Sequence, residues 1–250
     1  MLRPGDRVQI ATAAHAAKFE SWGLRVFVDT DLNSGLPDST VRAIVTEGVD
    51  HRLLAGLDFG VIARDPKPVV GVNTYLHLAA GIPAVYDWGN EPTEELRRVL
   101  METGPLVISA DPTAYTGTLR FPGRCSGILV GGSLSALRGM IGAGLPSLAG
   151  TILLLTDHRT IGLGKVDRQL THLRRAGALD GVRGVVVGPF PGFEDFTDRD
   201  WTVLDVLHDQ LSHLGIPFLG GIPTTPVPLG IPATLDADAG TLVMATRSKL

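Results

Sequence analysis

Short apolar runs alternate with amphipathic segments along most of the 250 residues of this chain. Nine of the runs are rich in β-branched residues and have the length of single strands. In order they read RVQIATA, LRVFVD, VRAIVTE, PVVGV, IPAVYD, SGILVGG, TILLLTD, RGVVVGPF and IPFLGGI. Continuous apolar runs are typical of strands buried on both faces. The pattern therefore predicts an α/β fold whose central strands are mostly parallel and covered by helices.

Two of the intervening segments predict helices. The first has Thr93 as its N-cap, carries acidic residues in its first turn and ends at Gly104. The second lies within 165–181. Its apolar residues recur at helical spacing, at Val166, Leu170 and Leu173. Each segment is therefore expected to pack one apolar face against a sheet.

The stretch ADPTAYTGTLRFPGR has two prolines, two glycines and no helical period. Such a composition predicts a connection between two lobes. We therefore expect a trimmed N-terminal domain over 1–110, a linker over 111–124 and a second domain over 125–250.

Composition and charge exclude several classes of function. The net charge is −4, from 22 basic and 26 acidic residues, and no run of five like charges is present, so neither nucleic acid nor a membrane surface is an expected partner. No apolar run approaches the roughly 18 residues of a membrane helix. The single cysteine, Cys125, excludes an intramolecular disulfide and a multi-cysteine metal site. We expect no cofactor and no metal, and, because the N-terminus lacks the pattern of a signal peptide, a cytoplasmic protein.

Five stretches, taken in order, carry a resemblance to a known family. They read LRPGDRVQIAT, PKPVVGVNTYLH, CSGILVGGSLSALRGMIG, TILLLTDHRTIGLGKVDRQLTHLRRAGALDGVRGVVVGPF and LGIPFLGGIPTTPVPLGIPATLD. Together they resemble the LD-carboxypeptidase family of serine peptidases, which also includes hydrolases of peptidyl-nucleotide antibiotics. The resemblance implies a flavodoxin-like N-terminal lobe and a β-rich α/β C-terminal lobe. It also implies a catalytic cleft between the lobes, a Ser-His-Glu triad and usually a homodimer.

The chain departs from that family at each triad position. The family places a Ser-Asp pair at the elbow after the PVVGV strand, a Glu at the end of the TILLL strand and a Gly-His pair before PLG. This chain has instead Asn73–Thr74, Thr156–Asp157 and Thr224–Thr225. An amide is a very poor nucleophile, and a threonine hydroxyl is weak without a base to take its proton. We therefore expect no serine carboxypeptidase activity.

The polar residues near these positions are candidates for ligand binding. They are Asn73, Thr74, His77, Thr156, Thr224 and Thr225. Asn73 is either a hydrogen-bonding group for a ligand or a turn residue that tolerates unusual dihedral angles. His77 lies one helical turn further on, where it either faces the cleft or is packed or solvated.

Asp157 and His158 are the candidate catalytic residues. They follow a buried strand directly, where α/β proteins place ligand-binding loops. Neighbouring residues on an extended chain point to opposite faces, so only one of the two is expected to face a ligand. A separate stretch, LVGGSLSAL, lacks the spacing and the lysine of a phosphate-binding loop and predicts a tight turn instead.

Three functions remain open from the sequence. The first is a repurposed enzyme that binds a small molecule in the inter-lobe cleft and promotes a cyclisation or elimination in a bacterial biosynthetic pathway. The second is a non-catalytic pseudo-peptidase that binds a peptide-like ligand or acts as dimer partner of an active paralogue. The third is a residual hydrolase with a shifted nucleophile such as Thr74. Whether the chain is an enzyme, and whether it forms a homodimer or a heterodimer, stays open at this point.

Overall fold

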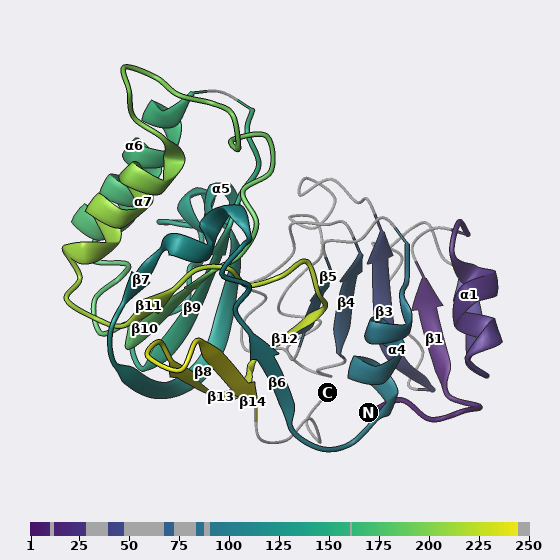
Figure 1. The fold of residues 1–250 in the computed structure, drawn as a ribbon. Coiled ribbons are helices and arrows are strands. Elements are labelled where there is room, and N and C mark those ends of the chain that lie inside the picture. The colour runs from purple at the N-terminus through teal and green to yellow at the C-terminus, as the bar shows by residue number, and fades with distance from the viewer. Residues whose placement is uncertain are drawn as a thin grey trace. The chain divides into compact units, whose positions relative to one another are not determined.

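The computed structural model describes residues 1–10, 13–28, 40–47, 68–72, 84–87, 91–160 and 162–244. The chain divides into two compact units, whose elements are labelled in Figure 1. The first unit comprises Met1–Pro105, Thr224–Ile231 and Thr246–Leu250. The second comprises Leu106–Pro223 and Pro232–Ala245. The segment Thr224–Ile231, which lies between the two parts of the second unit in the sequence, therefore belongs to the first unit.

The first unit is built on a sheet of six strands in the order β12-β5-β4-β3-β1-β2. Its strands are β1 (Arg7–Ile10), β2 (Arg25–Val28), β3 (Val41–Glu47), β4 (Val69–Val72), β5 (Ala84–Asp87) and β12 (Val227–Leu229). All neighbouring pairs from β5 to β2 are parallel. By contrast, β12 is antiparallel to β5, with Val227 opposite Tyr86. The parallel order predicted from the apolar runs is therefore confirmed in this unit.

Two helices of the first unit are described, α1 (Ala16–Ser21) and α4 (Glu94–Met101). The N-cap of α4 is Thr93, as predicted, and its hydroxyl accepts a hydrogen bond from the backbone N–H of Leu96 at 3.2 Å. The helix buries Leu96, Val99 and Leu100. It ends at Met101, before the predicted Gly104, because the backbone of the next residue is already extended.

The second unit contains a sheet of eight strands in the order β6-β14-β13-β8-β9-β10-β11-β7. Its strands are β6 (Leu106–Ser109), β7 (Arg120–Phe121), β8 (Arg124–Ser133), β9 (Thr151–Thr156), β10 (Gly184–Val187), β11 (Phe218–Leu219), β13 (Ile231–Asp236) and β14 (Thr241–Met244). The run from β8 to β11 is parallel. Antiparallel pairs join β14 to β13 and to β6, and β7 to β11. The sheet is therefore mixed, with its parallel strands together.

The helical elements of the second unit are η1 (Tyr115–Thr118), α5 (Leu134–Gly139), α6 (Leu163–Arg175) and α7 (Val203–Ser212). As predicted, α6 buries Val166, Leu170 and Leu173. It begins at Leu163, ahead of the predicted segment. Helices α6 and α7 lie side by side, as Figure 1 shows, and both bury apolar residues. The predicted α/β class is confirmed in both units.

The junction between β8 and α5 lies within the stretch LVGGSLSAL, where β8 runs to Ser133 and α5 begins at Leu134. Both Gly131 and Gly132 have strongly positive φ angles, 129° and 139°. A side chain on Gly131 would collide with the carbonyl oxygen of Leu154 on β9. Glycine is needed here because the two parallel strands approach closely where β8 gives way to the helix.

Backbone hydrogen bonds attach the segment 111–124 to the second unit. The N–H of Asp111 donates to the carbonyl of Gly221 at 2.8 Å, and the N–H of Gly220 donates to Leu119 at 2.7 Å. The buried hydroxyl of Thr116 accepts a bond from the N–H of Gly221 at 3.0 Å. This stretch is therefore folded against the strand β11 and the turn that follows it. The domain ranges expected from the sequence remain a prediction.

Candidate functional site

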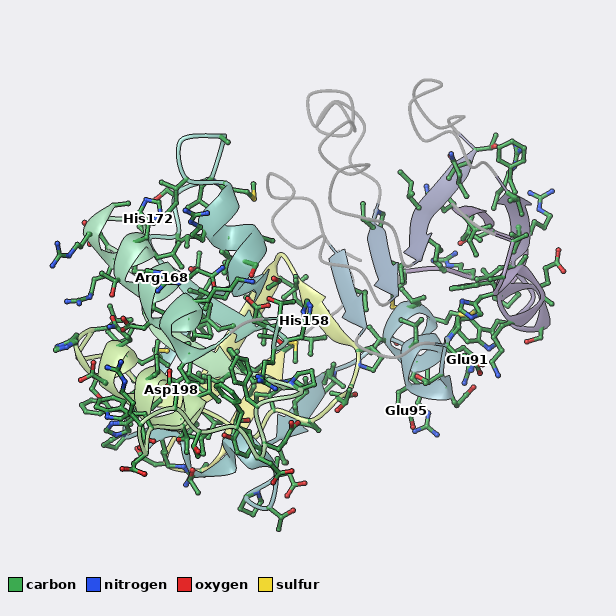
Figure 2. The ribbon with its side chains drawn as sticks, turned by 90° about the horizontal axis from the view of Figure 1, so that it is seen from above. Glu91, Glu95, His158, Arg168, His172 and Asp198 are labelled. Atoms are coloured by element: carbon green, nitrogen blue, oxygen red, sulfur yellow. The ribbon has the colours of Figure 1, made fainter. Side chains whose placement is uncertain are left out.

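The carboxyl ends of the parallel strands β8, β9 and β10 lie at one edge of the second sheet, where open α/β sheets place their ligand loops. Asp157 and His158 follow β9 directly at this edge. Figure 2 shows His158 in this segment, apart from the Arg168 and His172 side chains of α6. We define the site as the side chains gathered around this pair.

Asp157 is a buried carboxylate whose oxygens both accept hydrogen bonds. Its Oδ2 accepts from the backbone N–H of Ser135 at 2.9 Å and from the Ser135 hydroxyl at 2.7 Å. Its Oδ1 accepts from the backbone N–H of His158 at 2.8 Å. The side chain is 3% exposed. A carboxylate enclosed by three donors is held in one orientation.

His158 is the accessible member of the pair. Its side chain is 42% exposed, and its Nδ1 lies 3.7 Å from Oδ1 of Asp157. That separation is longer than a hydrogen bond but well within the range of electrostatic interaction. The His158 side chain is thus exposed and the Asp157 side chain buried, in line with the alternation expected along an extended chain. The His158 ring nevertheless lies close to the Asp157 carboxylate.

Thr156 makes a hydrogen bond inside the protein. The residue is 2% exposed. Its hydroxyl donates to the carbonyl oxygen of Pro189 at 2.5 Å, which ties the end of β9 to the loop after β10. The predicted ligand-binding role of this residue stays a prediction, but its hydroxyl already has an internal acceptor.

The loop after β10 packs beside His158 through Arg159. The backbone N–H of Arg159 donates to the carbonyl of Pro191 at 3.0 Å. The guanidinium carbon lies 3.8 Å from the ring centroid of Phe196, a cation–π contact. The Phe196 ring in turn meets the edge of the buried Phe193. These contacts fix both sides of the segment that carries the Asp157–His158 pair.

Two residues of the site were not singled out from the sequence. Ser135 holds Asp157, and its hydroxyl accepts a hydrogen bond from Nε2 of Gln169 at 3.0 Å. The sequence contains a feature that could have identified each of them. Ser135 follows β8 as Asp157 follows β9, and the ends of adjacent parallel strands meet at one edge. Gln169 is a polar residue on the apolar face of α6, and a buried polar side chain requires a partner.

The other predicted residues lie in other parts of the sequence. Asn73, Thr74 and His77 lie outside the described residues, although β4 ends at Val72, immediately before the predicted elbow. Thr224 and Thr225 belong to the first unit, at the start of the segment that leads into β12. Among the predicted residues that the structure describes, it brings together Thr156, Asp157 and His158.

Tyr115 of η1 has a buried hydroxyl that finds no hydrogen-bond partner within the described part of the chain. Burial raises the pKa of Tyr115, and the negative charges of Glu194, Asp205 and Asp195 raise it further. The phenol therefore stays protonated at ordinary pH and does not serve as a base.

The residues that the structure describes contain no group of three or more histidine, cysteine, aspartate or glutamate side chains arranged to hold a metal ion. None of their helices combines the length and the apolar composition needed to cross a membrane.

Comparison with known families and proteins agrees with this architecture. Residues 126–235 match the model of the LD-carboxypeptidase C-terminal domain. A protein of Streptomyces coelicolor named as a carboxypeptidase is 34% identical, over 86% of this chain and 75% of its own length. A protein of Bacillus subtilis named as a murein peptide carboxypeptidase is 26% identical, over the same shares of both chains, 86% and 75%.

Solved structures share the fold. A MccF-like protein from Bacillus anthracis superposes with a TM-score of 0.77 at 18% identity, covering 98% of each chain. A muramoyltetrapeptide carboxypeptidase from Oxalobacter formigenes superposes with a TM-score of 0.74 at 20% identity, covering 96% of this chain and 98% of that one. The fold is thus that of the MccF and LD-carboxypeptidase structures. With the sequence relatives above, the chain belongs to the LD-carboxypeptidase family.

Proposed function

We propose that this family member binds a small polar molecule beside His158 and promotes a non-hydrolytic step, a cyclisation or an elimination, in a bacterial biosynthetic pathway. The observation that carries the proposal is the pairing of an exposed imidazole with a buried carboxylate at 3.7 Å. An imidazole ring has one nitrogen that can accept a proton and one that can donate it, so it can serve as acid and as base. Positioning and proton transfer are sufficient for these reactions, which need no protein nucleophile.

Hydrolysis by the family's usual route is disfavoured by the residues present. The resemblance implies a serine nucleophile where this chain has Asn73, and an acid where it has Thr156. Loss of triad members leaves only about 10³–10⁴-fold residual catalysis in serine peptidases. Asp157 does not replace the missing acid as a free base, because both its oxygens are occupied by donors. His158 is therefore the proton carrier in this proposal, and Asp157 orients it.

One observation favours the alternative of a non-catalytic pseudo-peptidase that binds a peptide-like ligand or supports an active paralogue as dimer partner. The hydroxyl of Thr156 donates a hydrogen bond to the carbonyl oxygen of Pro189 inside the protein. The position at which the resemblance implies a catalytic residue thus has a structural role in this chain. A residual hydrolase with a shifted nucleophile such as Thr74 ranks third.

The masses of reactants and products separate these functions. The full chain is incubated with a metabolite extract, and substrate loss and product gain are followed by mass spectrometry beside a His158→Gln variant. A cyclisation that rearranges bonds preserves the mass, an elimination splits off a neutral fragment, and hydrolysis adds the mass of water. We expect conversion without addition of water, lost in His158→Gln. Conversion that is equal in the variant refutes the role of His158.

A second assay addresses the peptidase alternatives directly. A fluorophosphonate probe and a murein tetrapeptide, the substrate class that the names of two relatives suggest, are offered to the purified chain. We expect no labelling and no release of the terminal amino acid. Tetrapeptide binding without turnover supports the pseudo-peptidase, and labelling that maps to Thr74 supports the shifted nucleophile.

A cytoplasmic location and a dimer, with itself or with a paralogue, belong to the same proposal. Light scattering on the purified chain, alone and mixed with a paralogue from the same genome, measures the assembly.

A further inference from the structure

We propose that Ser135 and Gln169 are positioning residues for the Asp157–His158 pair, a role that rests on the proposed function in taking His158 as the proton carrier. The four residues come from two helices and from the loop that follows β9. Ser135 lies in the first turn of α5, Gln169 lies on α6, and Asp157 and His158 follow β9. All belong to the second unit.

The hydrogen bonds of this network have a single direction. An ionised carboxylate only accepts, and the amide nitrogen of glutamine only donates. The Ser135 hydroxyl has one proton, which it gives to Asp157 at 2.7 Å. Its oxygen therefore accepts from Nε2 of Gln169 at 3.0 Å. Gln169 thus sets the direction of the serine proton, and the serine sets the position of the carboxylate. Bonds in such a chain polarise and strengthen one another.

The carboxylate held in this way favours one form of the neutral His158 ring. Oδ2 of Asp157 is occupied by the two donors of Ser135, so rotation of the carboxylate would break both bonds. Oδ1 then remains beside Nδ1 of His158, at 3.7 Å. A nearby negative charge favours a proton on Nδ1 and leaves the lone pair on Nε2. Nε2 is consequently the atom that would accept a proton from a ligand.

The chain contains a matched control for Gln169. Gln210 of α7 is buried to a similar degree, with 8% of its surface exposed against 7% for Gln169. It too donates through Nε2, to Asp167 at 2.8 Å and to Thr171 at 3.3 Å. The side-chain oxygen of each glutamine has no hydrogen-bond partner among the residues that the structure describes. Gln210 donates to residues of α6 and not to Ser135, so its replacement reproduces the loss of burial and bonding without touching the network.

Nitrogen NMR of the imidazole ring tests the role without any ligand. The full chain, labelled with ¹⁵N-histidine, is examined at about pH 8.5, where an imidazole is ordinarily neutral. The signals of His158 are identified by their loss in His158→Gln. We expect the Nδ1–H form to predominate in the wild type. Gln169→Leu and Ser135→Ala should each shift the ratio of the two forms toward Nε2–H by about fivefold, equivalent to about 1 kcal/mol, the net value of a neutral hydrogen bond. Ser135→Thr should restore the ratio, and Gln210→Leu should leave it unchanged.

Three results would overturn the proposal. The first is a wild-type ring without preference for Nδ1–H, and the second is a ratio that neither Gln169→Leu nor Ser135→Ala changes. The third is an equal shift in Gln210→Leu, which would indicate general loosening of the helices. Should Gln169→Leu fail to fold, Ser135→Ala decides alone, because it keeps the backbone donor to Asp157. Failure of the proposed function would appear as absent turnover and would leave these ring signals as expected.

Discussion

The hydroxyl of Thr156, at the end of β9, donates a hydrogen bond of 2.5 Å to the carbonyl oxygen of Pro189 in the loop after β10. The bond joins the carboxyl ends of two adjacent parallel strands directly beside the Asp157–His158 pair. It gives a structural role to the position where the family resemblance implies a catalytic acid.

Thr156→Val should therefore act mainly on stability. Valine has nearly the same shape, but it leaves the Pro189 carbonyl without this donor. We expect the free energy of unfolding to fall by about 1–3 kcal/mol, the cost of stranding a buried polar group. Urea denaturation measures the change. The exposed Thr197 offers a control, since Thr197→Val should change stability by less than about 0.5 kcal/mol. A Thr156→Val protein as stable as the wild type would contradict this account.

Asp157→Asn should loosen the site. The amide presents one acceptor atom where the carboxylate presents two, and its nitrogen would face either Ser135 or the N–H of His158, both of which donate. Hydrogen bonds to a charged group are worth about 1.5–3 kcal/mol, and we expect a loss of unfolding free energy in that range. Asp180→Asn, at an exposed position, serves as the comparison in the same denaturation series. Equal stability of the two variants would show that the buried carboxylate is not held as described.

Thr202→Ala should weaken the start of α7 in a way that depends on pH. Thr202 and Asp205 form a capping box, in which Oδ2 of Asp205 accepts from the hydroxyl and the backbone N–H of Thr202. The bond from the Thr202 hydroxyl, and then that from its N–H, holds the pKa of Asp205 below its ordinary value. A lowered pKa contributes stability above the ordinary carboxyl pKa of about 4, and this contribution is lost as the pH falls through the lowered value. We expect Thr202→Ala to cost about 0.5–2 kcal/mol at neutral pH and clearly less at about pH 2. A cost independent of pH, measured by denaturation at both values, would argue against the carboxylate's part in the cap.

Cys125 should react slowly in the folded protein. Burial raises the pKa of its thiol, and the positive charge of Arg183 opposes this only in part. The thiolate is the reactive form, so iodoacetamide should label the native chain more slowly at pH 8 than the chain unfolded in urea. Labelling of the native chain should accelerate as the pH rises above about 8.5, the ordinary thiol pKa. Native labelling at the unfolded rate at pH 8 would contradict the burial of this thiol.

Leu170→Ala should test the core beneath α6. Leu170 is 1% exposed, so its truncation leaves a cavity that close neighbours fill only partly. We expect a loss of about 2–5 kcal/mol in the free energy of unfolding. Arg168, exposed on the same helix and labelled in Figure 2, supplies the control, because Arg168→Ala should change stability little. Similar costs for the two variants would mean that the apolar stripe of α6 does not carry the packing assigned to it.

The sequence by itself determined the local elements. All nine apolar runs are strands, the cap at Thr93 begins α4, and the stripe at Val166, Leu170 and Leu173 is the buried face of α6. These features depend on the period of apolar residues and on capping, which neighbouring residues decide among themselves. The LD-carboxypeptidase resemblance and the α/β class followed from the same runs taken in order.

Only the tertiary structure decided which distant residues meet. Val227 on β12 returns to pair with Tyr86, a contact that no local period encodes. Ser135 reaches Asp157 across 22 positions, and Gln169 reaches Ser135 across 34. Such contacts depend on the order of the strands and on the helix laid over them, which the packing of the whole unit selects. The sequence could therefore place Asp157 and His158 after a buried strand, but the fold alone made one the buried partner and the other the exposed ring.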